Sequence, residues 1–182
     1  MTRRETPIKD LFIFEPKVFG DSRGYFFETY NQKVFGSSGV DVSFVQDNES
    51  LSRFGTLRGL HFQKGSHAQA KLVRAVHGEI WDVAVDLRPT SPTFGQSFGT
   101  RLSGENKNQF FIPRGFAHGF VVLSDTALVV YKCDNFYSPE HEGGIHYADQ
   151  DLAIDWILPD EKILTSDKDK KNPSFRSTRE QL

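Results

Sequence analysis

Four side chains able to bind or transfer protons, His61, Lys71, Asp82 and Tyr131, lie in four separate segments whose residue pattern is typical of strands. An imidazole, an ammonium group, a carboxylate and a phenol can together carry acid–base chemistry on a bound molecule. Polar side chains are costly inside a small barrel unless they are paired or functional. We therefore predict that these four residues form one interior cluster, although any one of them taken alone is more simply explained as facing solvent.

A second pattern with chemical meaning is the spacing Pro-x-Gly-x-x-His over residues 113–118. It resembles the second half-motif of cupins, which are double-stranded β-helix barrels. Metal-binding cupins also carry His-x-His and a Glu in the first half-motif, whereas the matching place here, His61-Phe62-Gln63, offers one imidazole. The remaining histidines are scattered: His67, His77, His141 and His146. We expect no catalytic metal, because three nitrogen ligands cannot be assembled from the usual positions.

The elements that must position these residues are predicted to be short strands at residues 57–63, 71–77, 80–87, 96–102, 109–112, 120–123 and 127–133. Turn-forming residues separate them, such as Gly78-Glu79 between the second and third strands. This pattern favours an antiparallel sandwich or barrel. Within residues 57–63, strict alternation predicts that His61 and Arg58 lie on opposite faces.

Helical periodicity is weak throughout the chain. We expect at most one or two helical turns, near residues 32–35 or 149–154. The segment 166–173 is strongly charged, and by composition alone it is typical of a solvated, partly mobile terminus.

Composition sets further limits. The length of 182 residues suits one domain, placed at 1–182, and 17 Phe supply enough apolar surface for a core. A formal net charge of −2 gives no global reason to bind nucleic acid or an anionic membrane. The apolar runs are too short for a membrane helix, and no signal peptide is visible. The single cysteine, Cys133, excludes an intrachain disulfide and suits a reducing, cytoplasmic compartment.

Eight segments, taken together and in order, make the chain resemble the dTDP-4-dehydrorhamnose 3,5-epimerase family. They are residues 15–24, 44–48, 57–63 (LRGLHFQ), 71–74 (KLVR), 82–86 (DVAVD), 91–95 (SPTFG), 113–120 and 135–139 (NFYSP). The combination is highly specific, and no single piece would be. The resemblance runs from about residue 8 to about residue 173 and implies an all-β, cupin-like jelly roll with a few short helices.

The family acts on a dTDP-linked 4-keto-6-deoxyhexose, so the resemblance implies proton chemistry beside a ketone. The C4 carbonyl acidifies the hydrogens at C3 and C5, and removing either gives an enolate that can be reprotonated from the opposite face. Such a reaction needs a base, an acid across the ring and a group that holds the enolate oxygen. It needs no redox cofactor, which agrees with the absence of a GxGxxG fingerprint.

The resemblance also implies residue roles. His61 matches the family's base, Tyr131 its acid and Lys71 its enolate-stabilising lysine. Asp169, in the C-terminal Ser-x-Lys-Asp motif, matches the carboxylate that orients the base, with Asp167 as a local competitor. If Asp169 has this role, the charged tail folds back over the barrel.

For the nucleotide, the resemblance implies that Arg23 and Arg58 lie near the diphosphate and that Tyr137 stacks on thymine. The remaining matched substrate-contact positions are Phe26, Glu28, Gln46, Asp47, Asn48, Glu142 and Lys168. His118 matches a second substrate contact, and a structural histidine held by a carboxylate such as Asp82 is an equally good interpretation. Family members are homodimers that exchange N-terminal strands, and some site residues cross the interface.

Three alternatives stay open beside inversion of both C3 and C5, which would convert dTDP-4-dehydro-6-deoxy-D-glucose to dTDP-4-dehydro-L-rhamnose. A related epimerase could invert one centre only, because the base, acid and lysine would be shared. A non-catalytic cupin could merely bind a sugar nucleotide. A metal-dependent cupin would hold a transition metal.

Overall fold

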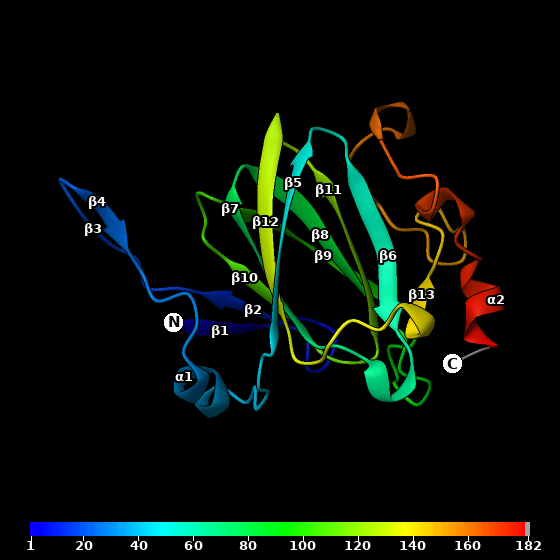
Figure 1. Ribbon diagram of the computed structural model, residues 1–182, viewed down its shortest axis with the longest axis horizontal. Helices are drawn as coiled ribbons and strands as arrows, with labels where there is room; N and C mark the ends of the chain where they lie inside the picture. The colour runs from blue at the N-terminus through cyan, green and yellow to red at the C-terminus, as the bar shows by residue number, and fades with distance from the viewer. Residues whose placement is uncertain (181–182) are drawn as a thin grey trace.

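The computed structural model describes residues 1–180, in which two antiparallel sheets face each other (Figure 1). The first sheet has six strands in the order β1 (Thr2–Glu5), β2 (Phe12–Glu15), β10 (Gln109–Ile112), β7 (Lys71–His77), β12 (Thr126–Cys133) and β5 (Gln46–Arg53). The second has five strands in the order β13 (Glu142–Gly144), β6 (Leu57–Gln63), β11 (Phe116–Val122), β8 (Glu79–Asp86) and β9 (Ser97–Ser103). The predicted all-β jelly roll is confirmed.

The few helices are short, as predicted. They are α1 (Gln32–Ser37), α2 (Phe175–Arg179) and the 3-10 turns η1 (Gly65–His67), η2 (Pro139–His141), η3 (Asp160–Lys162) and η4 (Asp169–Lys171). Asn31 caps α1 by accepting from the amides of Lys33 and Val34. The expected turn at residues 32–35 is therefore confirmed, whereas residues 149–154 form turns rather than a helix. Within residues 1–180, no helix is both long and apolar enough to cross a membrane.

Strand β8 shows how the sequence builds two cores. Its residues Ile80 and Ala84 are buried between the two sheets, in a cluster that includes Val73 and Val129 of the opposite sheet. The alternate residues Val83, Val85 and Leu87 pack on the other face, where the C-terminal segment contributes Leu152 and Trp156. A strand buried on both faces carries few polar residues. Any polar side chain on its inner face is placed between the two sheets, where it needs a partner or a function.

The predicted strand boundaries hold closely in the centre of the chain. Strands β6, β7 and β10 match the predicted ranges, and β8 begins one residue earlier, at Glu79. Strand β11 begins at Phe116, four residues before the predicted start. Strand β5 was not predicted, because its sequence QDNESLSR is polar with only one fully buried position, Ser52.

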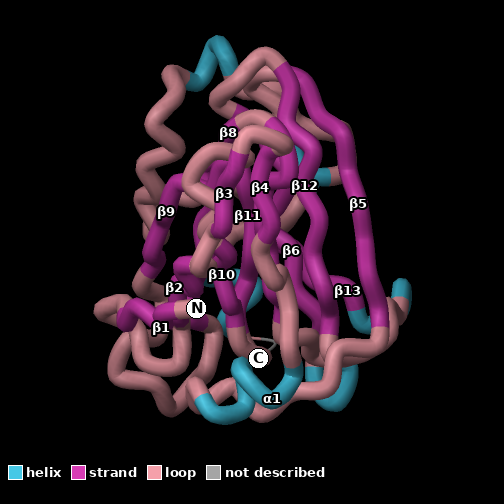
Figure 2. The backbone as a smooth tube through the Cα atoms, turned by 90° about the vertical axis from the view of Figure 1, so that its left-hand side faces the viewer, coloured by secondary structure: helices cyan, strands magenta, loops and turns pink. Residues whose placement is uncertain are grey.

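A two-stranded hairpin, β3 (Phe19–Asp21) and β4 (Gly24–Phe26), projects away from the two sheets (Figure 1). In the view turned by 90° it lies in front of them (Figure 2). Every residue of both strands is exposed, and Phe19, Tyr25 and Phe26 retain 54%, 60% and 70% of their accessible surface. Large aromatic side chains exposed on a projecting arm are typical of a surface that another chain covers.

The C-terminal segment follows a different course from the one its charge suggested. After β13 the chain packs along the outer face of the five-stranded sheet, and Leu164 forms a bridge with Thr56 at the start of β6 (Figure 1). Asp169 is 4% exposed. The composition-based prediction of a solvated segment over 166–173 holds for most of its residues, which are exposed, but not for Asp169, which is buried in contact with His61 of β6.

Candidate active site

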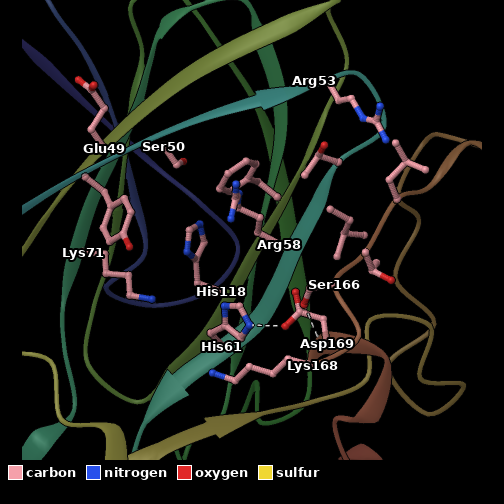
Figure 3. A pocket seen from close by; sticks show the side chains of 16 residues that line it. Glu49, Ser50, Arg53, Arg58, His61, Lys71, His118, Ser166, Lys168 and Asp169 are labelled. Carbon is pink, nitrogen blue, oxygen red and sulfur yellow. Dashed lines mark hydrogen bonds and ion pairs between the residues drawn. The ribbon is translucent and has the colours of Figure 1, made fainter.

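A cavity of about 570 Å³ opens between the two sheets. It is lined by three of the four residues singled out for proton chemistry, His61, Lys71 and Tyr131. The fourth, Asp82, is represented by its partner His118. Its walls include His61, Lys71, His118, Tyr131 and Asp169, several of which are drawn in Figure 3. His61 and His118 come from β6 and β11 of the five-stranded sheet. Lys71 and Tyr131 come from β7 and β12 of the six-stranded sheet. The cavity is thus walled by an imidazole pair on one sheet and an ammonium–phenol pair on the other.

His61 is held by the C-terminal segment. Its Nε2 lies 2.7 Å from Asp169 Oδ1 (Figure 3). The Gly59 amide donates to Asp169 Oδ2 over 3.4 Å. Burial acts to raise the pKa of Asp169, but these bonds and the nearby His61 outweigh burial and lower it. An ionised carboxylate on Nε2 selects the Nε2–H tautomer, which leaves Nδ1 with the free lone pair.

The competing carboxylate, Asp167, lies outside this arrangement. Its side chain is 92% exposed and faces the Nζ of Lys170 at 3.8 Å. Of the two aspartates in the C-terminal motif, Asp169 is therefore the one in contact with His61.

Arg58 lines the same cavity as His61, so the predicted opposition of these two side chains is wrong. The register between β6 and β11 shifts between the pairs His118–His61 and Phe120–Arg58. Such a bulge adds a residue to one strand and turns a side chain to the other face. Gly59 permits it, since a Cβ there would lie 2.6 Å from the Cα of Gly119.

His118 is a buried histidine held by a carboxylate, and it also lies at the cavity wall. It lines the cavity and is 7% exposed, and its Nε2 also lies 2.9 Å from Asp82 Oδ1. Asp82 is fully buried, which raises the pKa of its carboxyl despite the opposing effects of His118 and Lys71. Burial likewise lowers the pKa of His118, against the attraction of Asp82. The pair is thus a buried histidine–carboxylate unit at the cavity wall.

Lys71 and Tyr131 lie side by side on the paired strands β7 and β12 of one sheet. The Nζ of Lys71 lies 6.0 Å from the centroid of the Tyr131 ring. Burial lowers the pKa of Lys71, and Cys133, Asp82 and Glu142 act against that effect. Burial raises the pKa of Tyr131, so the phenol keeps its proton beyond its ordinary range. The wall therefore offers a cation and a protonated phenol to one bound molecule.

A second hollow of about 370 Å³ continues from the first and shares His61, Lys71 and Tyr131 with it. It is lined by further predicted contact residues: Gln46, Asn48, Tyr137 and Glu142. The Oε2 of Glu142 accepts from the Tyr137 hydroxyl over 2.8 Å and lies 2.7 Å from Lys168 Nζ. Burial acts to raise the pKa of Glu142, but these two donors outweigh it and lower the pKa.

Four predicted contact residues lie outside the cleft of their own chain. Arg23 and Phe26 belong to the projecting hairpin, where Arg23 pairs with Asp21, and Glu28 follows it and accepts from Asn31. Asp47 pairs with Lys132 and is exposed. Within the chain, Arg23 and Glu28 are therefore bonded to near neighbours in the sequence rather than to groups of the cleft.

Sequence reasoning missed several residues of the cleft, Glu49, Ser50, Arg53, Gln63, Gln69 and Cys133, and the partner of Arg58, Ser52. Ser52 accepts from Arg58 Nε over 3.0 Å. Gln63 could have been found, since it follows His61 by two residues on the same strand. The serines could not, because the polar strand that carries them gave no strand signal. Among residues 1–180 no group of three His, Cys, Asp or Glu side chains is arranged to hold a metal ion.

Comparison with known proteins agrees with the fold. The family model for dTDP-4-dehydrorhamnose 3,5-epimerase matches residues 5–177. The dTDP-4-dehydrorhamnose 3,5-epimerase of Pseudomonas aeruginosa is 58% identical over 169 residues, covering 92% of each chain. The crystal structure of the dTDP-6-deoxy-D-glucose-3,5-epimerase RmlC from Legionella pneumophila, in complex with dTDP-4-keto-L-rhamnose, is 50% identical with a TM-score of 0.93. That structure covers 96% of this chain, and this chain covers 93% of it.

A more distant structure carries the same fold. ChmJ, a 3'-monoepimerase from Streptomyces bikiniensis in complex with dTDP-quinovose, is 31% identical with a TM-score of 0.89 and covers 97% of this chain, which covers 89% of it. The fold alone therefore does not separate one-centre from two-centre enzymes. The family match spans nearly the whole chain, and the chain belongs to the dTDP-4-dehydrorhamnose 3,5-epimerase family.

Proposed function

We propose that the protein inverts C3 and C5 of dTDP-4-dehydro-6-deoxy-D-glucose to give dTDP-4-dehydro-L-rhamnose in dTDP-rhamnose biosynthesis. The observation that carries the site assignment is that His61 and Tyr131 line one cavity from opposite sheets. Inversion requires a proton to leave one face of the sugar ring and return to the other. Two proton-transfer groups on facing walls meet that requirement.

His61 is the proposed base. With Nε2–H directed at Asp169, its Nδ1 takes the proton from the carbon beside the ketone. Asp169 stabilises the imidazolium that forms, because a buried carboxylate on the opposite nitrogen offsets the new positive charge. The electrons of the C–H bond move onto O4 and give an enolate.

Lys71 is the proposed enolate-stabilising residue. An ammonium group in a partly desolvated wall interacts with a developing oxyanion far more strongly than it would in water. Because the ketone is neutral and the enolate is charged, this interaction favours the transition state over the bound substrate.

Tyr131 is the proposed acid. Its phenol is protonated and lies on the sheet that faces His61, so it can return a proton to the carbon from the other side. Repeating the sequence at the second acidic carbon completes the double inversion. The reaction consumes no oxidant or reductant, and the proposal includes neither a cofactor nor a metal.

The proposed nucleotide contacts surround this centre. Arg58 supplies diphosphate contacts and Tyr137 a face on which thymine stacks. The other proposed contacts within the chain are Gln46, Asn48, His118, Glu142 and Lys168. Tyr137 is 51% exposed in the chain by itself, which leaves its ring accessible to a base.

The proposal includes a homodimer in which the N-terminal hairpin reaches the partner subunit. Supporting it, Arg23 and Phe26 lie on an exposed arm away from the cleft of their own chain, and Glu28 follows that arm. An arm that places these residues in the cleft of the partner subunit would account for their match to substrate-contact positions. In this proposal Asp47 also lies at the interface between the two subunits. We place this single cupin-like domain, residues 1–182, in the cytoplasm, which suits its single buried cysteine. Residues 181 and 182 lie outside the described part of that range.

Inversion of both centres is favoured by the pattern of relatives. Chains named as 3,5-epimerases reach 58% identity, whereas the 3'-monoepimerase ChmJ is 31% identical. The test is NMR of the purified protein with the 4-keto substrate in deuterated water. Deuterium and inversion at both C3 and C5 support the proposal, deuterium at one centre supports the one-centre alternative, and exchange at neither centre supports a binding protein.

A further inference from the structure

Gln63 lies at the end of β6, in the wall of the second hollow, and the proposed mechanism gives it no task. Its side chain belongs to a residue that is only 8% exposed. The amide nitrogen, Nε2, donates to the backbone carbonyl of Phe136 over 3.2 Å and to that of His67 over 3.1 Å. The amide oxygen, Oε1, accepts from the backbone amide of Ser138 over 2.7 Å. Both ends of one buried amide group are thus bonded to backbone.

The residue enclosed by two of these contacts is Tyr137. Phe136 precedes it and Ser138 follows it, so Gln63 is bonded to the peptide groups on both sides of the tyrosine. Residues 136–138 belong to no helix or strand. Backbone groups in such a segment still need partners, and a side-chain amide can supply a donor and an acceptor at once. Gln63 therefore fixes the backbone that carries the Tyr137 ring.

The hydroxyl end of Tyr137 is held by the residue that pairs with Gln63 across the sheet. Glu142 of β13 is opposite Gln63 of β6. Its Oε2 accepts from the Tyr137 hydroxyl over 2.8 Å. Two neighbouring residues at one sheet edge thus hold the tyrosine, one at its backbone and the other at its ring. Because Tyr137 is still 51% exposed, the ring is fixed in place but open to a ligand.

The same strand carries the proposed base. His61 precedes Gln63 by two residues, and both line the second hollow. Two residues of a strand span about 6.6 Å, and their side chains leave the same face. Strand β6 therefore sets the spacing between the group that takes the proton and the support of the ring proposed to stack on thymine.

Building on the proposed function, we infer that Gln63 is a positioning residue that fixes the backbone of Tyr137 and so holds its ring ready to stack on thymine. A ring that is ordered before the nucleotide arrives loses less conformational entropy on binding. Because thymine takes no part in the proton transfer, this effect is equal in the bound substrate and in the transition state. Loss of Gln63 therefore raises KM far more than it lowers kcat.

The direct test is calorimetric titration of Gln63→Met with dTDP. Methionine has a similar length but offers neither the donor nor the acceptor. The dissociation constant of dTDP should rise about 5- to 30-fold, since a stack of a base on an aromatic side chain contributes roughly 5- to 150-fold to binding. Unchanged binding of dTDP would overturn the inference.

The matched control is Gln69→Met. Gln69 also lines the second hollow, and its Nε2 donates to the carbonyl of Asn135 over 2.8 Å, but it bonds to neither neighbour of Tyr137. This variant should weaken dTDP by less than about 3-fold. Equal weakening in the two variants would show that any loosening of the loop has the effect, and the role assigned to Gln63 would be wrong.

A double-mutant cycle tests whether Gln63 acts through Tyr137. Tyr137→Ala removes the ring, so adding Gln63→Met to that variant should weaken dTDP by less than a further 2-fold or so. If the two changes multiply instead, Gln63 contributes to binding independently of Tyr137, which contradicts the inference.

Kinetics with the 4-keto substrate give a further readout. In Gln63→Met, KM should rise about as much as the dissociation constant of dTDP, with kcat within about 3-fold of the wild type. A general distortion of the cleft would lower kcat as well, and an equal loss in kcat would exclude a positioning role limited to the nucleotide.

If Gln63→Met does not fold, Gln63→Asn replaces it in each measurement. Asparagine keeps the amide but is one methylene shorter, so it cannot reach both neighbours of Tyr137 together, and dTDP should again bind more weakly. The titrations need no turnover, which separates the inference from the function on which it rests. A wild type that binds dTDP but exchanges no hydrogen at C3 or C5 would contradict the proposed reaction alone. Wild-type affinity for dTDP in the folded variant would contradict the role of Gln63 alone.

Discussion

A 2.7 Å contact joins Nε2 of His61 to Oδ1 of Asp169 across 108 residues of sequence. The imidazole belongs to a central strand and the carboxylate to a segment that packs against the barrel only after the strands have ended. Both the orientation and the tautomer of the proposed base are therefore set by a distant part of the chain.

Replacing His61 by Ala should abolish turnover while leaving nucleotide binding nearly intact. A positioned general base contributes about 10²–10⁴-fold to rate, and it acts on the transition state rather than on the bound nucleotide. Steady-state kinetics and calorimetric titration with dTDP measure the two effects separately. Normal turnover in the variant would remove His61 from the mechanism.

Replacing Asp169 by Asn should lower kcat by about 10²–10⁴-fold, because an amide can donate to Nε2 and favour the wrong tautomer. Asp167→Asn is the matched control, since Asp167 is 92% exposed and outside the cleft. Its kcat should stay within about 2-fold of the wild type. Equal losses in the two variants would show that the effect comes from the charge of the segment rather than from contact with His61.

Replacing Tyr131 by Phe should reduce epimerisation more than hydrogen exchange at the first centre. The base can still remove a proton and return it to the same face, but no phenol is present to deliver one from the other sheet. Deuterium incorporation by NMR, compared with product formation, measures the two. If both fall by the same factor, Tyr131 positions the substrate rather than protonating it.

The stability of the fold should depend on Asp86 at acidic pH. Burial acts to raise the pKa of Asp86, but bonds from Arg88, Ser91 and Thr93 outweigh it and lower the pKa from 3.8 to about 2. Because the folded state favours the carboxylate, this contribution is present above the unfolded pKa of 3.8 and is lost as the pH falls toward 2. Asp86→Asn should cost about 1–2 kcal/mol at pH 7 by urea unfolding. The difference from the wild type should shrink below about pH 3, and a constant difference would contradict this account.

Mixing two inactive variants should restore activity if the hairpin reaches the partner. Arg23→Ala removes an arm residue and His61→Asn removes a cleft residue. In a mixed dimer, one cleft would combine an intact His61 with the intact arm of the other subunit. The two proteins are refolded together and assayed against each one alone. No recovery in the mixture, with mixed dimers confirmed by mass spectrometry, would place Arg23 at its own cleft or at none.

The sequence predicted the centre of the molecule well because hydrophobic alternation is strong there. Strand β6 has the predicted bounds, and the four clustered residues do lie between the sheets. Alternation predicted the wrong face for Arg58, because the bulge depends on the close approach of Gly59 to Gly119. The sequence alone does not show that these two glycines are in contact.

Two other features had no local signal at all. The charge of the C-terminal segment predicts solvation, and only the tertiary contact with His61 explains why Asp169 is buried. The position of Arg23 and Phe26 is likewise not local, because a projecting arm has no core of its own to set a pattern. In both cases the resemblance to a family, rather than periodicity, pointed to the residues.

The late position of Asp169 makes catalysis depend on the end of the chain. Strand β13 ends at Gly144, so a chain cut after that point would keep every strand of both sheets and lose the carboxylate that orients its base. A protease that trims the C-terminal segment would thus remove Asp169 together with Leu152 and Trp156, which pack on the outer face of the five-stranded sheet. During synthesis, the protein becomes an enzyme only once the ribosome has passed Asp169.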